Sequence, residues 1–159
     1  MFRIVLLQIV LAIVIFVVYT AVTFYKNLLS RKFSDRSPES FKNNILNVGI
    51  ALAMEFGENW GKDIQDRLKA LFPHLTQGEL DDHNKVCRQA MRQGQDSLQA
   101  RLDQLLKNNE KISETDLKQV WMESLLKACP WIDEENLTHL FAQSMYYASK
   151  EGLTRGIVI

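Results

Sequence analysis

The uncharged run IVLLQIVLAIVIFVVYTAVTFY, residues 4–25, decides the class of protein to which this chain belongs. A helix rises 1.5 Å per residue, so this run extends roughly 33 Å, enough to cross a hydrocarbon core about 30 Å thick. Inside lipid the backbone has no water to bond, so a single span must be helical. The sequence therefore predicts a transmembrane helix over residues 4–25, with the lipid bilayer as a first partner.

The ends of this run favour a retained anchor over a cleaved signal peptide. A secretory signal has an apolar core of about 7–15 residues, followed by small residues before the cleavage site. Here the core is longer, and its exit carries Tyr19 and Tyr25, which suit the membrane–water interface. Residues 1–3 form only a short flank. Because the span carries no charged side chain, an ion pathway within it is not expected.

Basic residues after the span predict its orientation. Residues 26–37 form a connector in which one acidic side chain stands against four basic ones, namely Lys26, Arg31, Lys32 and Arg36. By the positive-inside rule, this bias places the C-terminal domain in the cytoplasm. Attraction to anionic lipid would add about 1 kcal/mol for each basic residue near the surface. We therefore expect a single-pass membrane protein whose domain lies at the cytoplasmic face.

Residues 38–152 read as one all-α domain, a helical-hairpin bundle of about five helices, followed by a C-terminal tail over residues 153–159. Helix-start signals occur at Ser37-Pro38, Thr76, Ser113 and Asp133. The first helix has a broad apolar face, extending from Phe41 to Phe56, and is the predicted central helix. A second is expected from Trp60 to Leu71. No segment of the domain has the pattern of a strand.

The remaining three predicted helices follow from apolar stripes at helical spacing. The third runs over about thirty residues with near-heptad spacing, and its stripe comprises Leu80, His83, Cys87, Met91, Gly94, Leu98, Leu102 and Leu105. The stripe of the fourth comprises Leu117, Val120, Trp121, Leu125 and Ala128. That of the fifth comprises Leu137, Leu140, Phe141, Ser144, Met145 and Ala148, with Gly152 as the expected stop.

Two helix–turn–helix units superpose when the chain is shifted by 57 residues. Pro73-His74-Leu75-Thr76 then falls on Pro130-Trp131-Ile132-Asp133, and the stripes of the preceding helices agree in phase. Duplication would explain this match, but two unrelated helix hairpins also share such stop and start signals. Either origin predicts two antiparallel helical hairpins beside the central helix.

Charge and cysteine content exclude some classes of function. Residues 37–159 carry 14 basic and 18 acidic side chains, so the domain is acidic and offers no basic face to nucleic acid. A membrane-tethered helix–turn–helix DNA binder is therefore the weakest hypothesis. Cys87 and Cys129 are the only cysteines, and in the cytoplasm both are expected to be reduced thiols.

One cluster suggests a metal or redox protein as the alternative function. Glu79, His83 and Cys87 are spaced four residues apart, so they share one face of the third helix and offer ligands that zinc or iron accepts. His83 and Cys87 also belong to the apolar stripe, which favours packing over ligation, so no metal or cofactor is predicted. Phosphate-binding loops and nucleophile elbows are absent from the sequence, and no catalytic residue is predicted.

Aromatic and terminal residues are the candidates for binding another protein. Trp60 and Trp121 occur at helical spacing and are assigned to the core. Five candidates for partner contact remain: Trp131, Tyr146, Ile157, Val158 and Ile159. The long stripe over residues 77–108 also suggests self-association. The first hypothesis is therefore a membrane-anchored interaction or adaptor protein, in which the anchor raises the effective concentration of a partner at the same surface.

Overall fold

A computed structural model of the chain describes residues 38–158. The predicted span 4–25 and connector 26–37 lie outside the described residues. So do the six residues predicted at the membrane interface, namely Tyr19, Tyr25, Lys26, Arg31, Lys32 and Arg36. No helix within residues 38–158 is long and apolar enough to cross a membrane. The chain divides into two compact units, Met1–Phe41 and Lys42–Ile159, and the second unit is the domain described below.

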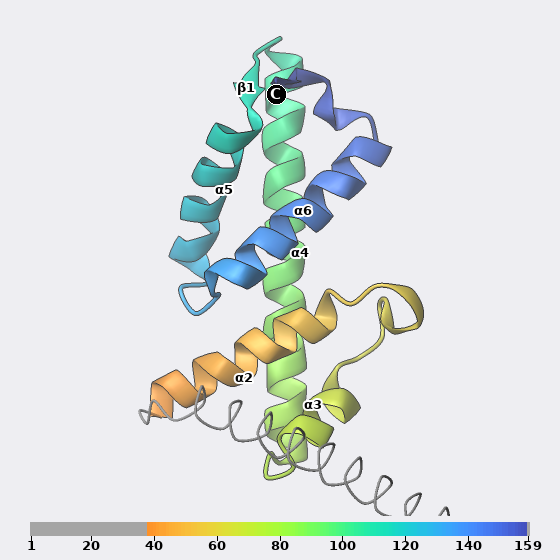
Figure 1. The fold of residues 1–159 in the computed structure, drawn as a ribbon, viewed down its shortest axis with the longest axis vertical. Coiled ribbons are helices and arrows are strands. Elements are labelled where there is room, and N and C mark those ends of the chain that lie inside the picture. Colours follow the sequence, from red (N-terminus) through yellow and green to blue (C-terminus); the bar gives the residue numbers. More distant parts are fainter. Residues whose placement is uncertain (1–37, 159) are drawn as a thin grey trace, which may run out of the picture. The chain divides into compact units, whose positions relative to one another are not determined.

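The prediction of an all-α fold with about five helices is confirmed for the described residues. The helices are α2 (Pro38–Ala53), α3 (Gln65–Leu71), α4 (Gln77–Lys107), α5 (Glu114–Ala128) and α6 (Glu134–Lys150). Short 3-10 turns lie at η1 (Gly57–Asn59) and η2 (Leu153–Gly156). Two strands of two residues each, β1 (Ile112–Ser113) and β2 (Ile157–Val158), pair with each other (Figure 1).

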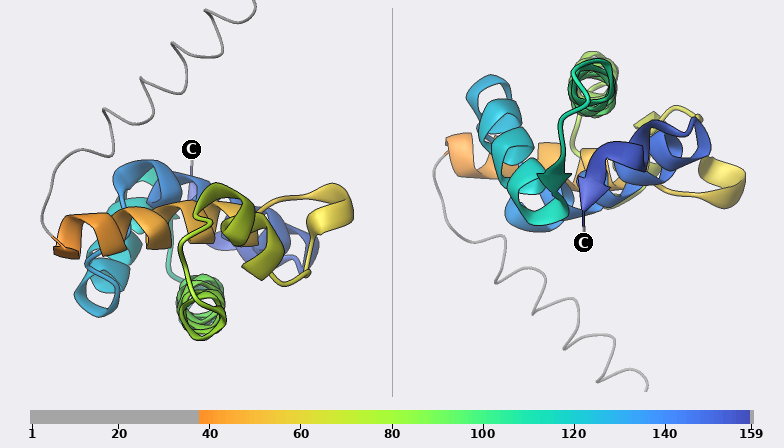
Figure 2. Two further views of the ribbon diagram at one scale, coloured as in Figure 1. Left: turned by 90° about the horizontal axis from the view of Figure 1, so that it is seen from below. Right: turned by 90° about the horizontal axis from the view of Figure 1, so that it is seen from above.

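Helix α4 is the element on which the others pack. It is 31 residues long and starts with the predicted capping box, in which Thr76 and Glu79 bond each other's backbone N–H. Its predicted stripe is buried at every position except His83, which is half-buried. Helices α2 and α3 lie along its N-terminal half, and α5 and α6 along its C-terminal half (Figure 1). The end-on views show α4 on one side of these helices (Figure 2).

Two predictions about helix placement are wrong. The role predicted for the helix that begins at Pro38 belongs instead to α4, on which the other helices pack and whose apolar stripe extends over about seven turns. The second helix starts at Gln65, not at Trp60. Gly61 has φ +74°, a left-handed conformation that an α-helix does not contain, so residues 57–61 form turns instead. At the far end of that helix, Leu71 is exposed.

Glycine allows two close approaches between helices. At Gly94 of α4, an added Cβ would lie 2.7 Å from Leu140 Cδ2 of α6 and 3.1 Å from Trp121 Cζ2 of α5. The indole N–H of Trp121 donates to the Gly94 carbonyl at 2.9 Å. At Gly49 of α2, an added Cβ would lie 2.7 Å from Cys87 Sγ of α4. These contacts leave no space for a methyl group, so each glycine sets the distance between its helix and the next.

The two hairpins predicted by the 57-residue shift have the same backbone geometry. Phe72 and Cys129, which end α3 and α5, have φ, ψ of −126°, 72° and −130°, 66°. The N-caps Thr76 and Asp133 have −74°, 163° and −76°, 166°. Equivalent turn hydrogen bonds also recur, from Leu75 N to Phe72 O at 3.1 Å and from Ile132 N to Cys129 O at 3.2 Å. Both hairpins therefore contain the same type of turn, with equivalent hydrogen bonds.

The end of the chain pairs with the segment between α4 and α5. Strands β1 and β2 are parallel, with Ile112 opposite Ile157 and Ser113 opposite Val158. Sequence reasoning missed this pair because each strand has only two residues. Gly152, at φ +75°, ends α6 as predicted and turns the chain back towards α4.

Candidate functional site

The loop between α2 and α3, residues 54–64, exposes two large aromatic side chains. Phe56 is 55% exposed and Trp60 is 39% exposed. The assignment of Trp60 to the core is therefore wrong, whereas Trp121 is buried as predicted, at 3% exposed. Glycines with positive φ, Gly57 at +76° and Gly61 at +74°, lie on either side of Trp60 and shape the loop that presents it.

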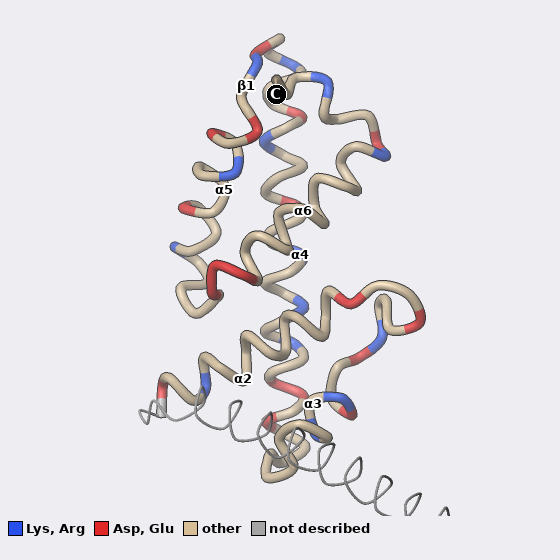
Figure 3. The backbone as a smooth tube through the Cα atoms, viewed as in Figure 1, with Lys and Arg blue, Asp and Glu red and all other residues tan. Residues whose placement is uncertain are grey.

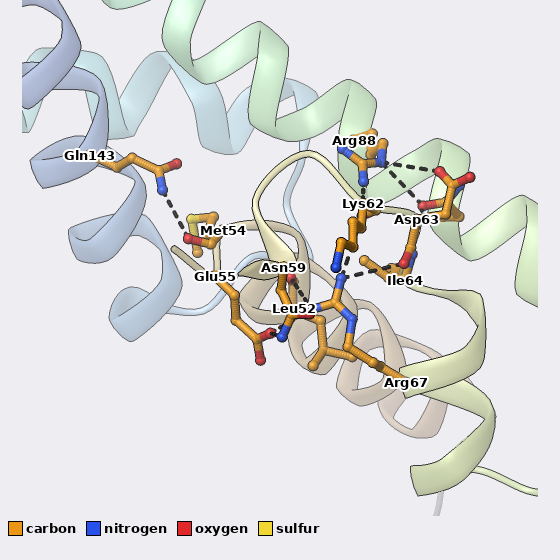
Figure 4. A network of polar contacts seen from close by, with 11 residues as sticks. Leu52, Met54, Glu55, Asn59, Lys62, Asp63, Ile64, Arg67, Arg88 and Gln143 are labelled. Carbon is orange, nitrogen blue, oxygen red and sulfur yellow. Dashed lines mark hydrogen bonds and ion pairs between the residues drawn. The ribbon is translucent and has the colours of Figure 1, made fainter. Parts of the chain in front are cut away.

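Polar side chains from two helices, α3 and α6, hold this loop at its N-terminal side (Figure 4). Arg67 of α3 donates through Nη1 to Leu52 O at 2.9 Å and to Glu55 Oε2 at 2.5 Å. Gln143 of α6 is buried and donates through Nε2 to Met54 O at 2.9 Å. These bonds satisfy carbonyl groups at the end of α2 that have no partner within the helix.

The C-terminal side of the loop is held by α4. Asn84 accepts a hydrogen bond from Ile64 N at 3.3 Å and donates through Nδ2 to Asp63 Oδ1 at 3.0 Å. Arg88 donates to Lys62 O, and its Nε lies 3.6 Å from Asp63 Oδ1. The loop thus has bonded supports at both ends (Figure 4). Its two aromatic side chains are therefore exposed from a defined backbone.

Four aromatic rings form a continuous surface, which we call the aromatic ladder: Phe56, Trp60, Tyr147 and Tyr146. Phe56 and Trp60 stack with ring centres 5.7 Å apart, and Trp60 and Tyr147 stack at 5.5 Å. Tyr147 and Tyr146 of α6 meet edge to face at 5.4 Å. Lys150 Nζ lies 5.3 Å from the centre of the Tyr146 ring. The ladder therefore joins the loop to α6 and already holds a cation at one end.

A pocket of about 230 Å³ opens beside the ladder, between α4 and α6. Trp60 and Tyr147 contribute to its wall, while the buried small residues Ser144 and Ala148 form its base. The pKa of the Tyr147 hydroxyl is raised, first by desolvation and then by Tyr146, so this phenol is neutral at physiological pH. Small side chains at the base provide the space, and the aromatic side chains provide an apolar wall.

The rest of the pocket wall is polar and acidic. Asp96 and Gln95 come from α4, as does Gln99, whereas Glu151 follows the end of α6. Gln99 Nε2 donates to the Glu151 carboxylate, and Gln95 Nε2 donates to Gln143 Oε1 at 3.5 Å. The residues that line this pocket include no basic side chain. The pocket therefore presents negative charge and hydrogen-bond acceptors.

A second, more open groove of about 890 Å³ follows α4 and shares Asp96 with the first pocket. Lys85, Arg88 and Arg92 line it together with Asp63 and Asp96. Charges of both signs are interspersed along this part of α4 (Figure 3). Arg88 is already bonded to the loop, so the groove does not present a uniform charge to a ligand.

The three residues of the metal hypothesis have other partners. The Glu79 carboxylate accepts from Thr76 N at 2.8 Å, and this bond is the main cause of the lowered pKa of Glu79. His83 bonds the Glu79 carbonyl through Nδ1. Cys87 is buried, its Sγ donates to Leu46 O at 3.4 Å, and burial raises the pKa of its thiol to about 12. Within residues 38–158, no three His, Cys, Asp or Glu side chains gather where they could hold a metal ion.

The structure places the predicted partner-binding residues in different surroundings. Tyr146 is 50% exposed and belongs to the ladder. Trp131 is half-buried and packs against the core. Ile157 also packs against the core, Val158 is 43% exposed, and Ile159 lies outside the described residues. The stripe that suggested self-association over residues 77–108 is occupied by packing within the domain.

Sequence reasoning missed three members of the site, Phe56, Trp60 and Tyr147. The sequence pattern predicts Phe56 on the apolar face of the first helix and Trp60 on that of the second, so neither is expected at the surface. The available signal was the pair Gly57 and Gly61, because two glycines so close to a tryptophan favour a loop over a helix. Comparison with protein-family models, curated proteins and solved structures finds no match to this chain.

Proposed function

We propose that this chain is a membrane-anchored interaction protein whose helical domain docks a partner protein through the aromatic ladder. The observation that carries the proposal is a run of four contiguous rings beside a loop with bonded supports. Three of these rings are exposed, and the fourth, Tyr147, is half-buried. Exposed aromatic side chains of this kind are enriched among the residues that dominate protein interfaces. The anchor predicted over residues 4–25 would hold the domain at the membrane and raise the effective concentration of a partner there.

The character of the loop supports docking over a role in folding alone. Residues that only stabilise the domain would bury their apolar surface, yet Phe56 is 55% exposed and Trp60 is 39% exposed. Their backbone is held by Arg67, Arg88 and Gln143, so little further ordering is needed when a partner binds. A preorganised surface gains affinity because the entropy of ordering is not lost on binding.

The test is site-specific photocrosslinking of the full chain in native membranes, followed by binding to the purified partner. A photoreactive residue replaces Phe56 in one chain and the exposed Val120 of α5 in a control chain. We expect a discrete adduct with one protein from position 56 and none from position 120. The Trp60→Ala variant should then weaken the affinity of the full chain for that purified protein by about 30-fold, as for a typical hot spot.

Val120→Ala, which removes an apolar side chain that is 53% exposed elsewhere, should leave that affinity unchanged. Equal weakening by both variants would contradict docking through the ladder. A crosslinked adduct between two copies of this chain would show that the ladder mediates self-association. That result would also overturn the proposal.

A further inference from the structure

The pocket beside the aromatic ladder has the size of a site for one side chain. Its volume is about 230 Å³, below the roughly 300–1,000 Å³ of pockets that bind drug-sized ligands and cofactors. It opens at the surface next to Trp60 and Tyr147, where the proposed partner would lie. A side chain projecting from a docked protein segment therefore fits its position and size.

The charge of the pocket selects a cation. Asp96 and Glu151 contribute two carboxylates from opposite walls, and no basic residue among the residues that line the pocket offsets them. Lys150, which is close in sequence, lies over the Tyr146 ring instead. A positively charged side chain entering between Asp96 and Glu151 would meet an opposite charge on either side.

The hydrogen-bonding groups of the pocket favour a ligand with many donors. The amide nitrogens of Gln95 and Gln99 already donate within the protein, which leaves their carbonyl oxygens as acceptors. The Ser144 hydroxyl likewise donates to Leu140 O at 2.7 Å. An arginine side chain carries five donors and no acceptor, and its planar guanidinium packs against aromatic rings better than the compact ammonium of lysine.

We propose that this pocket binds one arginine side chain of the partner protein, between Asp96 and Glu151 and against the Trp60–Tyr147 wall. This inference rests on the proposed function, since it names the chemistry by which the docked segment is recognised. The ladder supplies apolar contact area, and the pocket supplies selectivity, because an uncharged side chain in the same place would leave both carboxylates without an opposite charge.

The experiment uses the full chain in detergent with its tryptophans labelled by ¹⁵N, and acetyl-arginine amide as the probe. The chain has three tryptophans, so three indole N–H signals are expected, and the Trp60→Phe variant identifies the one that reports on the pocket. Trp121, bonded to Gly94 O and Ser97 Oγ, is an internal control. Acetyl-citrulline amide has nearly the same shape as the probe but no charge.

We expect the Trp60 signal to move in a saturable manner with the arginine probe, at millimolar concentration, and to remain in place with the citrulline probe. The double variant Asp96→Asn/Glu151→Gln should weaken the arginine response at least tenfold. The control variant Asp82→Asn/Glu135→Gln removes the same two charges from exposed positions on α4 and α6 and should retain the response. Equal responses to both probes, no response, or equal responses of both double variants would overturn the inference.

Binding of the purified partner to the same variants separates this inference from the proposed function. If Trp60→Ala weakens partner binding and Asp96→Asn/Glu151→Gln does not, the arginine site is wrong and docking through the ladder stands. If the probe binds but the partner is indifferent to Trp60→Ala, the pocket stands and the proposed function fails.

Discussion

The contact between α4 and α6 at Gly94 predicts a specific cost of adding one methyl group. In Gly94→Ala, the new Cβ would lie 2.7 Å from Leu140 Cδ2 and 3.1 Å from Trp121 Cζ2. Neither neighbour can yield freely, because Leu140 is fully buried and the Trp121 indole is bonded to Gly94 O. Overpacking of this kind destabilises by about 1–3 kcal/mol. Against this cost, replacing glycine by alanine inside a helix stabilises the helix by about 1 kcal/mol.

The net effect expected for Gly94→Ala is therefore a loss of about 0–2 kcal/mol in the free energy of unfolding. Gly78→Ala is the matched control, because Gly78 lies on the same helix and an added Cβ there meets nothing within 4 Å. That variant should be neutral or more stable by up to about 1 kcal/mol. Hence the difference between the two variants, about 1–3 kcal/mol, isolates the packing cost.

The assay is urea unfolding of the full chain in a mild detergent, followed by far-ultraviolet circular dichroism. Removing the obstacle by Leu140→Ala should reduce the penalty of Gly94→Ala, since residues in contact are energetically coupled. The reasoning is refuted if Gly94→Ala and Gly78→Ala have the same stability, or if the penalty persists unchanged in the Leu140→Ala background. Because α4 and α6 also form the two walls of the proposed arginine pocket, Gly94→Ala should weaken the response to the arginine probe.

Two further predictions concern polar groups that are hydrogen-bonded within the domain. The thiol pKa of Cys87 is raised by burial to about 12, so the folded state keeps a proton that the unfolded state loses above its ordinary value of about 9. The contribution of this thiol to the free energy of unfolding is fully present below pH 9 and should fall by about 1.4 kcal/mol per pH unit between pH 9 and 12. Cys87→Ala should therefore flatten this part of the curve of stability against pH. An unchanged slope in Cys87→Ala would contradict the raised pKa of the Cys87 thiol. Asn47 of α2 donates through Nδ2 to Trp131 O at 2.7 Å and accepts from Asp133 N at 2.9 Å. Asn47→Ala should therefore destabilise the domain by about 1–3 kcal/mol in the same urea assay. An unchanged free energy of unfolding would mean that water replaces both hydrogen bonds.

Elements whose signals are local could be predicted from the sequence. Thr76, Ser113 and Asp133 each accept a hydrogen bond from a backbone N–H three residues later, so their effect depends only on a few neighbouring residues. The stripe of α4 has one period over about seven turns and allows one buried face. The 57-residue shift recovered two equivalent turns because a helix stop, a proline and an N-cap are local as well.

The site itself was predicted only in part. The sequence predicts Tyr146 at the surface because this residue precedes a stripe position, and Tyr146 is exposed. The spacing of Trp60 to Ile64 and Leu68 predicts a helix that includes Trp60, but the conformation of Gly61 prevents that helix from starting so early. Tyr147 joins the site because α6 brings it to Trp60, 87 positions away in the sequence, and no local pattern encodes that contact.

The sequence by itself determined the helical class of the domain, most helix boundaries and the buried faces of α4 and α6, because these follow from caps and periodicities within one element. The tertiary structure alone decided which aromatic side chains stay exposed, that Gly94 brings α4 and α6 together, and that Asp96 and Glu151 face one pocket. Exposure and proximity depend on contacts between residues far apart in the chain. Those contacts exist only after the helices have packed.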